Sequence, residues 1–282
     1  MSMSKVTIVI ATRDRAPELR RSLPRHAVHQ APVIVVDNAS SDDTAAVAGA
    51  AGASVIRLPR NIGAAARNVG AEAADTPYVA FADDDSWWAP GALDTAAEIL
   101  DAHPRAALLA ARVLVGDQER VDPVSQQMER SPLDAPDGLP GRAILGFLAC
   151  SIVLRRAAFL DAGGFSAALH FGGEEDLLAL DLAAAGWGLA YVPGLVVHHH
   201  PSELVRDPAG RRRREARNRL LTAWLRRPLP VLVRTALASL GSAEARSGLL
   251  DAVRSLPGLV RARRPLPPEV EAARKRLDSA MA

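Results

Sequence analysis

The sequence has little cysteine and no apolar run long enough to cross a membrane. Its single cysteine, Cys150, excludes an intramolecular disulfide, which fits a reducing compartment without requiring one. The longest mainly apolar run, Ala143–Leu154, is too short to span a bilayer, and the apolar run near the N-terminus is too short for a signal peptide. These absences predict a soluble or peripheral protein of the cytoplasm.

Two common phosphate-binding motifs are absent as well. No Gly-x-Gly-x-x-Gly follows the first apolar run, and the chain has no Gly-Lys-Ser/Thr loop. These motifs supply the tight turns and backbone N–H groups that hold phosphates in dinucleotide and P-loop sites. The sequence therefore argues against both kinds of site.

Positive charge is scarce in the first part of the chain, and negative charge is scarce in the last. Residues 206–282 hold 18 Lys and Arg against 7 Asp and Glu, whereas residues 1–205 hold 16 against 25. The net charges are therefore +11 and −9, although the whole chain carries only +2. This imbalance predicts two parts: a main domain of residues 1–205 that handles a metal, and a basic helical extension of residues 206–282 that meets an anionic surface.

Short apolar runs alternate with helical segments at the start of the chain. Four runs have the composition of buried parallel strands: Val6–Ile10, Val33–Val36, Val55–Leu58 and Tyr78–Ala82. Helices are expected between them, beginning at Pro17–Leu23, covering Thr44–Ala51, and running from after Gly63 to Ala74. The alternation predicts an α/β fold with a mainly parallel central sheet.

The elements expected after residue 86 are more varied. Trp88–Gly91 reads as the entry to a helix, and residues 116–141 are polar and contain several prolines, which predicts a long functional loop with short pieces of structure. We further expect a strand over Phe147–Leu154, a helix over Leu177–Ala185, and short strands at Ala190–Val192 and Leu195–Val197.

Three consecutive aspartates, Asp83, Asp84 and Asp85, follow the fourth strand. Because side chains alternate along a strand, Asp83 and Asp85 would point the same way and Asp84 would be turned aside. Crowded carboxylates suit a hard divalent cation such as Mg²⁺, which takes one or two of them and completes its shell with water and phosphate oxygens. The alternative is an acidic surface turn before a helix.

Polar residues also follow the other predicted strands. Asp37 could accept hydrogen bonds from a base or ribose, or it could cap the following turn. Arg67, on the helix after Asn61-Ile62-Gly63, could pair with a diphosphate, or it could be a solvated helix arginine.

At this point the ordered motifs VTIVIATRDR, VVDNASSDDT, NIGAAARNVG and FADDDSWWAPGAL resemble the nucleotide-binding half of the family 2 inverting glycosyltransferases, which have the GT-A fold. The resemblance covers roughly residues 4–220. It implies a metal site formed by Asp83, Asp85 and His199, since the family places a histidine ligand six residues after the proline that is Pro193 here. It also implies a nucleotide site made by Ala11, Thr12, Arg13, Asp37, Asn61, Gly63, Arg67, Asp83 and Asp84.

The resemblance also implies a general base near residue 175. The family carries a Glu-Asp pair whose second member deprotonates the acceptor. Counting back without a gap from Gly186 gives Glu175, whereas matching the dipeptide gives Asp176, and we favour Glu175 while keeping both. Acidic residues in a first helical turn also stabilise the helix dipole, so capping is the alternative role for this segment.

The basic extension allows two interpretations. The resemblance suggests that Arg217 and Asn218 close over the diphosphate. The amphipathic pattern after residue 220 predicts helices that pack on the main domain, which we favour over helices that lie on an anionic membrane at the inner face.

Taken with the resemblance, the sequence predicts an inverting hexosyltransferase-type enzyme that uses Mg²⁺ or Mn²⁺. It would move a sugar from a nucleoside-diphosphate sugar, a UDP- or dTDP-sugar, to an acceptor hydroxyl in polysaccharide, glycolipid or natural-product synthesis, without binding nucleic acid. The rivals are a sugar-1-phosphate nucleotidyltransferase, which usually has a glycine-rich loop where Ala11–Pro17 has none, and a non-catalytic sugar-nucleotide binder docked on a membrane.

Overall fold

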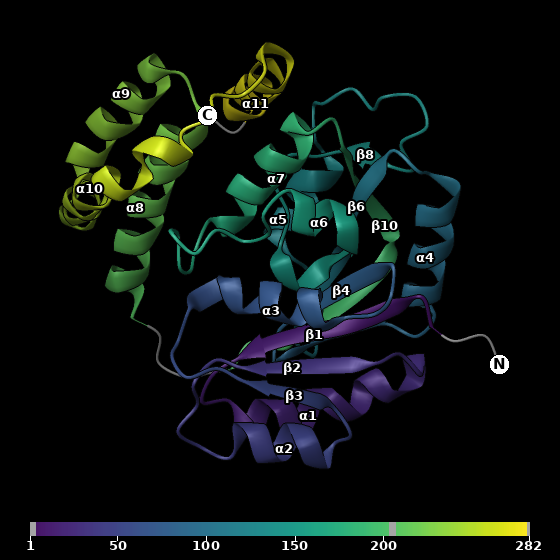
Figure 1. Cartoon of the computed structure of the whole chain (residues 1–282). Helices are drawn as coiled ribbons and strands as arrows, with labels where there is room; N and C mark the ends of the chain where they lie inside the picture. Colours follow the sequence, from purple (N-terminus) through teal and green to yellow (C-terminus); the bar gives the residue numbers. More distant parts are fainter. Residues whose placement is uncertain (1–3, 203–206, 281–282) are drawn as a thin grey trace.

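The computed structural model describes residues 4–202 and 207–280 (Figure 1). The boundary expected between residues 205 and 206 lies outside these ranges.

The first third of the chain folds as the alternation predicts. Strands β1, β2, β3 and β4 are parallel neighbours in the order β3-β2-β1-β4. The apolar runs of β1, β2 and β4 pack between two helical layers and are mostly buried, whereas the edge strand β3 is partly exposed. The elements are β1 (Val6–Thr12), α1 (Ala16–His26), β2 (Val33–Asp37), α2 (Thr44–Ala50), β3 (Ser54–Arg57), α3 (Ala66–Ala73) and β4 (Tyr78–Ala82).

The second part of the sheet is mixed. Strand β9 lies antiparallel between β4 and β6, and β10 runs parallel to β6. The small strands β5, β7 and β8 are antiparallel to their partners. The elements are β5 (Ser86–Trp88), α4 (Ala92–Ala102), β6 (Ala106–Val115), β7 (Arg120–Val121), α5 (Pro123–Glu129), β8 (Arg142–Ala143), β9 (Ile152–Arg155), α6 (Arg156–Asp161), α7 (Glu174–Ala184) and β10 (Gly188–His199).

The helix entry expected at Trp88–Gly91 leads to α4, which begins at Ala92 with Gly91 as its N-cap, although Trp88 itself ends strand β5. Two expectations for this part were wrong in detail. The segment Phe147–Leu154 is strand only from Ile152, because a 3-10 turn precedes it. The two short strands around Pro193 are one strand, β10, with a register shift between Val192 and Val196 that absorbs the proline.

Two hydrophobic clusters cover the two faces of the sheet and form the core. One cluster includes side chains of α3, α6 and α7, and the other includes side chains of α1, α2 and α4. Buried aromatic side chains fill the first cluster, where the Phe81 and Phe159 rings lie 5.3 Å apart. This three-layer arrangement leaves the carboxyl ends of β1, β2 and β4 at one edge, where ligands of α/β sheets bind.

The last part of the described chain is helical, as predicted. Leu220, Leu221 and Leu225 on α8 form a separate hydrophobic cluster with α9, α10 and the start of α7. Helix α11 returns to lie beside α7 (Figure 1). None of the described helices is both long and apolar enough to cross a membrane. The helices are α8 (Pro208–Arg226), α9 (Leu229–Ala238), α10 (Ala243–Ser255) and α11 (Pro268–Ala280).

Candidate functional site

A cavity of about 520 Å³ lies at the carboxyl edge of the parallel strands. The ends of β1 and β4 supply its floor, and the segment before α3 and the first turns of α8 supply its walls. Of the residues expected at a nucleotide or metal site, those lining this cavity are Ala11, Thr12, Arg13, Asn61, Gly63, Arg67, Asp83, Asp84, Asp85 and His199.

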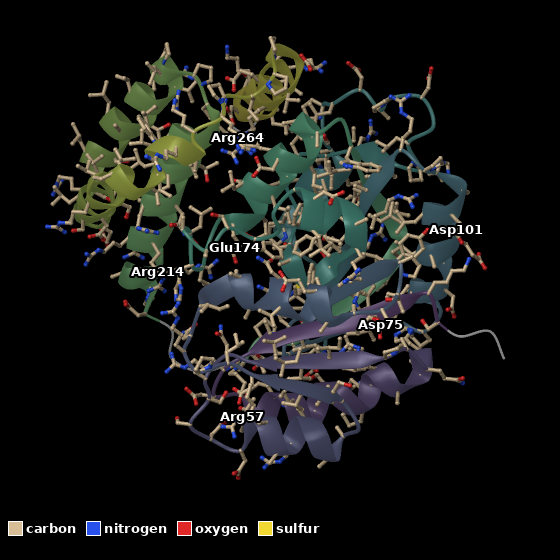
Figure 2. The ribbon with its side chains drawn as sticks, viewed as in Figure 1. Arg57, Asp75, Asp101, Glu174, Arg214 and Arg264 are labelled. Carbon is tan, nitrogen blue, oxygen red and sulfur yellow. The ribbon has the colours of Figure 1, made fainter. Side chains whose placement is uncertain are left out.

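Asp37 is the expected site residue that does not line the cavity. Its side chain is fully buried, where it accepts hydrogen bonds from Arg57 Nε at 3.2 Å and from the Ser40 N–H at 2.8 Å. Arg57 ends β3 beside it (Figure 2). The neighbouring Asn38 takes the place at the cavity wall.

The aspartate triplet does not continue the alternation of β4. The strand ends at Ala82, so the three aspartates form a turn before β5. Asp84 is therefore not turned aside: its Oδ1 and the Oδ2 of Asp85 both accept hydrogen bonds from Arg15, at 2.9 and 3.2 Å. Asp83 faces the other way and binds Arg67.

Arg15 also lines the first cavity, although the sequence analysis did not single it out. Besides the two aspartates, its Nη1 donates to Ser202 Oγ at 2.8 Å. Burial raises the pKa of Asp84 to about 6, although the charge of Arg15 opposes the shift. Burial likewise acts to raise the pKa of Asp85, but the hydrogen bond and charge of His199 outweigh it and hold that pKa below 3.8. Arg15 thus compensates part of the negative charge of the triplet.

Asp85 and His199 form a pair across strands β5 and β10. His199 Nε2 lies 3.2 Å from Asp85 Oδ1, because β10 runs antiparallel to β5 and brings His199 opposite Ser86. No group of three histidine, cysteine, aspartate or glutamate side chains within residues 4–202 and 207–280 is arranged to hold a metal ion. A carboxylate and an imidazole this close suit a divalent cation whose other ligands are water and phosphate oxygens.

Arg67 lies at the inner end of the cavity and is almost fully buried. Its Nη2 donates to Asp83 Oδ1 at 2.5 Å, and its Nε has no hydrogen-bond partner among the described residues. Burial acts to lower the pKa of Arg67, but the charges of Asp83, Glu174 and Glu175 outweigh it and raise that pKa above its usual value. The guanidinium therefore stays charged between the aspartate triplet and the start of α7.

Gly63 allows two chain segments to meet at the cavity wall. A Cβ atom on Gly63 would lie 2.1 Å from the carbonyl oxygen of His170, and its φ of 66° favours glycine. His170 and the exposed Phe171 consequently line the cavity opposite the aspartates. An exposed aromatic before Gly172-Gly173 is the sequence signal that could have marked this wall.

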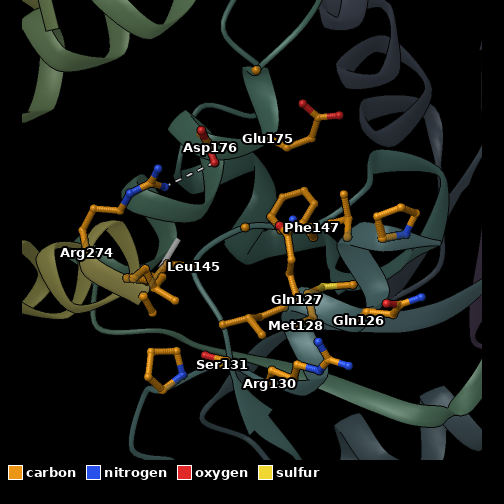
Figure 3. Close-up of a pocket in the computed structure, with 18 residues that line it drawn as sticks. Gln126, Gln127, Met128, Arg130, Ser131, Leu145, Phe147, Glu175, Asp176 and Arg274 are labelled. Carbon is orange, nitrogen blue, oxygen red and sulfur yellow. Dashed lines mark hydrogen bonds and ion pairs between the residues drawn. The ribbon is translucent and has the colours of Figure 1, made fainter. Parts of the chain in front are cut away.

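A second cavity, of about 740 Å³, adjoins the start of α7 (Figure 3). Glu175 and Asp176 both line it, together with α5, residues 144–147 and α11. The long polar segment of residues 116–141 was expected to be a functional loop with short pieces of structure. One of those pieces is helix α5, which lines this cavity.

The two candidate bases in this cavity have different surroundings. Burial, followed by the charge of Glu174, raises the pKa of Glu175 to about 8. Asp176 instead pairs with Arg274 on α11, its Oδ1 lying 3.3 Å from Arg274 Nη1, as Figure 3 shows. A carboxylate with a pKa near neutrality suits proton transfer, whereas an ion-paired carboxylate suits anchoring.

Arg217 and Asn218 do not line the first cavity. Asn218 Nδ2 donates to the carbonyl oxygens of Leu169, Phe171 and Gly172, and Arg217 Nη2 donates to that of Ala168. The two side chains therefore fasten the segment between the cavities to α8. Arg214 and Arg211, about one and two turns closer to the start of α8, line the cavity instead.

We expect Asn218→Ala to lower the free energy of unfolding by about 1–3 kcal/mol, because it leaves buried carbonyl oxygens without donors. Urea unfolding measures the change. Arg219→Ala, at an exposed position on the same helix, is the control and should change stability by less than about 0.5 kcal/mol. Equal changes in both variants would contradict the fastening role.

Comparison with known proteins supplies the context for this site. Residues 7–163 match the family described as glycosyl transferase family 2. The pre-mycofactocin glycosyltransferase of Mycobacterium tuberculosis is 35% identical over 214 residues, covering 71% of this chain but only 43% of that protein. The N-acetylglucosaminyl-diphospho-decaprenol L-rhamnosyltransferase of the same organism is 28% identical over 288 residues, covering 86% of this chain and 93% of that protein.

Solved structures are similar over nearly the whole chain. S. aureus TarS 1–349 in complex with UDP-GlcNAc has a TM-score of 0.61 and 16% sequence identity, covering 98% of this chain and 89% of that one. A second crystal structure of S. aureus TarS 1–349 has a TM-score of 0.60 and 18% identity, covering 98% of this chain and 88% of that one. At this identity the likeness concerns the fold alone, and it confirms the expected α/β fold of the GT-A type.

Proposed function

Because the chain belongs to glycosyl transferase family 2, we propose that it transfers a sugar from a UDP- or dTDP-sugar to an acceptor hydroxyl with inversion at the anomeric carbon. The observation that carries the proposal is the arrangement of two cavities around one cluster of charged side chains, those of Arg67, Asp83 and Glu175. Arg67 and Asp83 close the inner end of the first cavity, and Glu175 lines the second. A diphosphate and an acceptor could therefore reach the two sides of the same cluster.

The sugar nucleotide would occupy the first cavity. Thr12 and Asn38 offer hydrogen-bonding groups for the nucleoside, and the guanidinium groups of Arg13, Arg211 and Arg214 offer charge for the diphosphate. TarS, which has the same fold, has been crystallised in complex with UDP-GlcNAc and with UDP. That likeness supports a sugar nucleotide as the donor.

Asp85 and His199 would hold Mg²⁺ or Mn²⁺ beside the diphosphate. The bound cation would neutralise the departing diphosphate as a Lewis acid. Arg15 would hold Asp84 and Asp85 in place, because it donates hydrogen bonds to both carboxylates. Asp83, held by Arg67, is available to a water of the metal shell or to the sugar.

Glu175 would remove the proton from the acceptor hydroxyl as that oxygen attacks the anomeric carbon. Attack from the side opposite the diphosphate inverts the carbon, and it requires the acceptor and the leaving group to approach from different directions. The separate cavities meet that requirement. The raised pKa of Glu175 supports the assignment, because a base of ordinary carboxylate pKa is weaker at neutral pH.

A thermal-shift panel tests the proposal directly. We expect UDP, dTDP or one of their sugars, together with Mn²⁺, to raise the melting temperature, because a ligand that binds only the folded chain stabilises it. The matching nucleoside monophosphates and Mn²⁺ alone serve as controls. If no nucleoside diphosphate or sugar nucleotide stabilises the chain, with or without Mn²⁺, the proposal fails.

We further propose that the helical part contacts anionic membranes peripherally. Seven of the nine exposed large hydrophobic side chains in the described residues lie between residues 229 and 260. Three of them, Leu229, Val233 and Leu237, share one face of α9 because they are spaced by four residues. The same part of the chain holds exposed arginines, of which Figure 2 labels Arg264: Arg234, Arg246, Arg254, Arg261 and Arg264. Aliphatic side chains among cations suit anionic lipid.

We expect the chain to co-sediment with vesicles that contain anionic lipid and not with neutral vesicles, and to be released by high salt, which screens the attraction. Val233→Ser with Leu237→Ser should abolish the binding. Val28→Ser, at a similarly exposed position outside residues 229–260, is the control. Equal binding to neutral and anionic vesicles, or no binding to either, would contradict the proposal.

A further inference from the structure

The second cavity is completed by the last described helix of the chain. Arg274, Leu277 and Ala280 of α11 form one of its walls, 98 residues along the chain from the Asp176 that Arg274 binds. The other walls come from α5, residues 144–147 and the start of α7. An acceptor that fills this cavity and reaches Glu175 would therefore contact α11 (Figure 3).

Helix α11 is held firmly enough to act as a wall. Arg227, buried at the end of α8, donates to both carboxylate oxygens of Glu271 and to Asp278. Leu266 and Val270 pack against Leu180 of α7. Ion pairs and apolar contacts thus fix both ends of the helix, and the wall needs no ligand to form.

Half of the residues that line the cavity are apolar. Nine of the 18 lining residues are aliphatic, aromatic, methionine or proline: Pro123, Val124, Met128, Pro132, Ile144, Leu145, Phe147, Leu277 and Ala280. Glu175, Asp176 and Arg274 gather at the end nearest α7, and the other polar side chains of the lining are those of Gln126, Gln127, Arg130 and Ser131. A volume with both apolar walls and convergent polar groups is typical of a site for a small molecule rather than for water.

We propose, on the basis of the function proposed above, that α11 is part of the acceptor site and that the acceptor is an amphipathic molecule. Its apolar body lies against Leu145, Phe147 and Leu277, and its hydroxyl lies at Glu175. Arg274 acts as a positioning residue, because its pairing with Asp176 fixes the polar end of the cavity next to the base. A free monosaccharide would leave the apolar walls exposed to water.

Saturation-transfer NMR with two probes, n-hexyl β-D-glucoside and D-glucose, tests this chemistry in the presence of UDP and Mn²⁺. We expect saturation on the alkyl protons of the glucoside and none on glucose. Leu277→Ser should weaken binding of the glucoside about tenfold, because it removes apolar area from the wall. Val28→Ser, whose side chain is 56% exposed and lies outside residues 229–260, controls for alkyl chains that adhere to the surface and should change nothing.

The polar end is tested by Arg274→Gln against Arg276→Gln. Both arginines lie on α11, but Arg276 pairs with the exposed Asp134 and does not line the cavity. With the glucoside as acceptor, we expect Arg274→Gln to raise KM about tenfold or more with UDP affinity nearly unchanged, and to lower the melting temperature, because it loses its ion pairs with Asp176 and Asp278. Arg276→Gln should behave like the parent chain.

Equal signals from glucose and the glucoside, or equal loss in Leu277→Ser and Val28→Ser, would overturn the inference. So would a KM that Arg274→Gln leaves unchanged. Calorimetry with UDP separates these results from a failure of the proposed function. A chain that binds UDP but not the glucoside retains its function with another acceptor, whereas a chain that binds no nucleoside diphosphate loses the function altogether.

Discussion

Glu175→Gln is expected to fold, to bind the sugar nucleotide as tightly as the parent chain, and to lose turnover by roughly 10²–10⁴-fold, the usual size of general-base assistance. The amide keeps the shape of the side chain but cannot accept the proton of the hydroxyl. Binding should be unaffected because Glu175 lines the second cavity and not the one that holds the diphosphate. Steady-state kinetics, with UDP calorimetry alongside, measures both effects.

Asp176→Asn is the matched variant in the same turn of α7. Its carboxylate is already engaged by Arg274, so we expect a weaker ion pair, a lower melting temperature and most of the turnover retained. If Asp176→Asn is instead the inactive variant, the family's dipeptide gives the correct alignment and Asp176 is the base. Full turnover in both variants would remove the base from this segment.

The pH dependence of turnover offers an independent check on Glu175. A base must be ionised to act, and burial together with Glu174 raises the pKa of Glu175 to about 8. Turnover should therefore rise with pH and level off only above about pH 8. Glu174→Gln removes the neighbouring charge, so the rise should move to lower pH. An unshifted profile would mean that Glu174 does not influence the base.

The elements that the sequence predicted best are those whose signal is local. The runs Val33–Val36 and Tyr78–Ala82 lie within one residue of strands β2 and β4, because a buried parallel strand is apolar on both faces. The long strand β6 was missed. Its alanine-rich sequence, AALLAARVLV, gives no β-branched signal before Val113, and only its pairing with β9 and β10 makes it a strand.

The residues of the candidate site also divide into those with a local sequence signal and those whose contacts form only in the folded chain. Motifs at strand ends placed Thr12, Asn61 and Arg67 at one cavity, since the carboxyl ends of parallel strands meet at one edge. The contributions of Arg15 and Arg274 depend on partners 70 and 98 residues away along the chain. No periodicity or spacing records such contacts, so only the folded chain could reveal them. The prediction that Asp37 lines the nucleotide site differs from the structure for a related reason, because Asp37 is held away from the cavity by Arg57 of the adjacent strand.

Asp85→Ala is expected to remove the metal-dependent part of the affinity for UDP, a loss of about a hundredfold or more. In the parent chain, calorimetry should show tight UDP binding with Mn²⁺ and weak binding after chelation with EDTA. The variant should bind weakly in both conditions, because Asp85 supplies the only carboxylate that lies beside His199 in the described residues. Asp84→Asn is the comparison, since its carboxylate is engaged by Thr12 and Arg15.

The three consecutive histidines supply the sharpest control for the proposed metal site. His199 lies 3.2 Å from Asp85, whereas His198 and His200 on either side pair with Glu119 and Asp117 at the surface and contact the Trp87 ring. We therefore expect His199→Ala to reproduce the loss of metal-dependent UDP binding, and His198→Ala and His200→Ala to keep it, all three with similar melting temperatures. If the histidines are interchangeable in this assay, His199 is not a ligand. If Mn²⁺ leaves the UDP affinity of the parent chain unchanged, donor binding proceeds through Arg13, Arg211 and Arg214 without a cation.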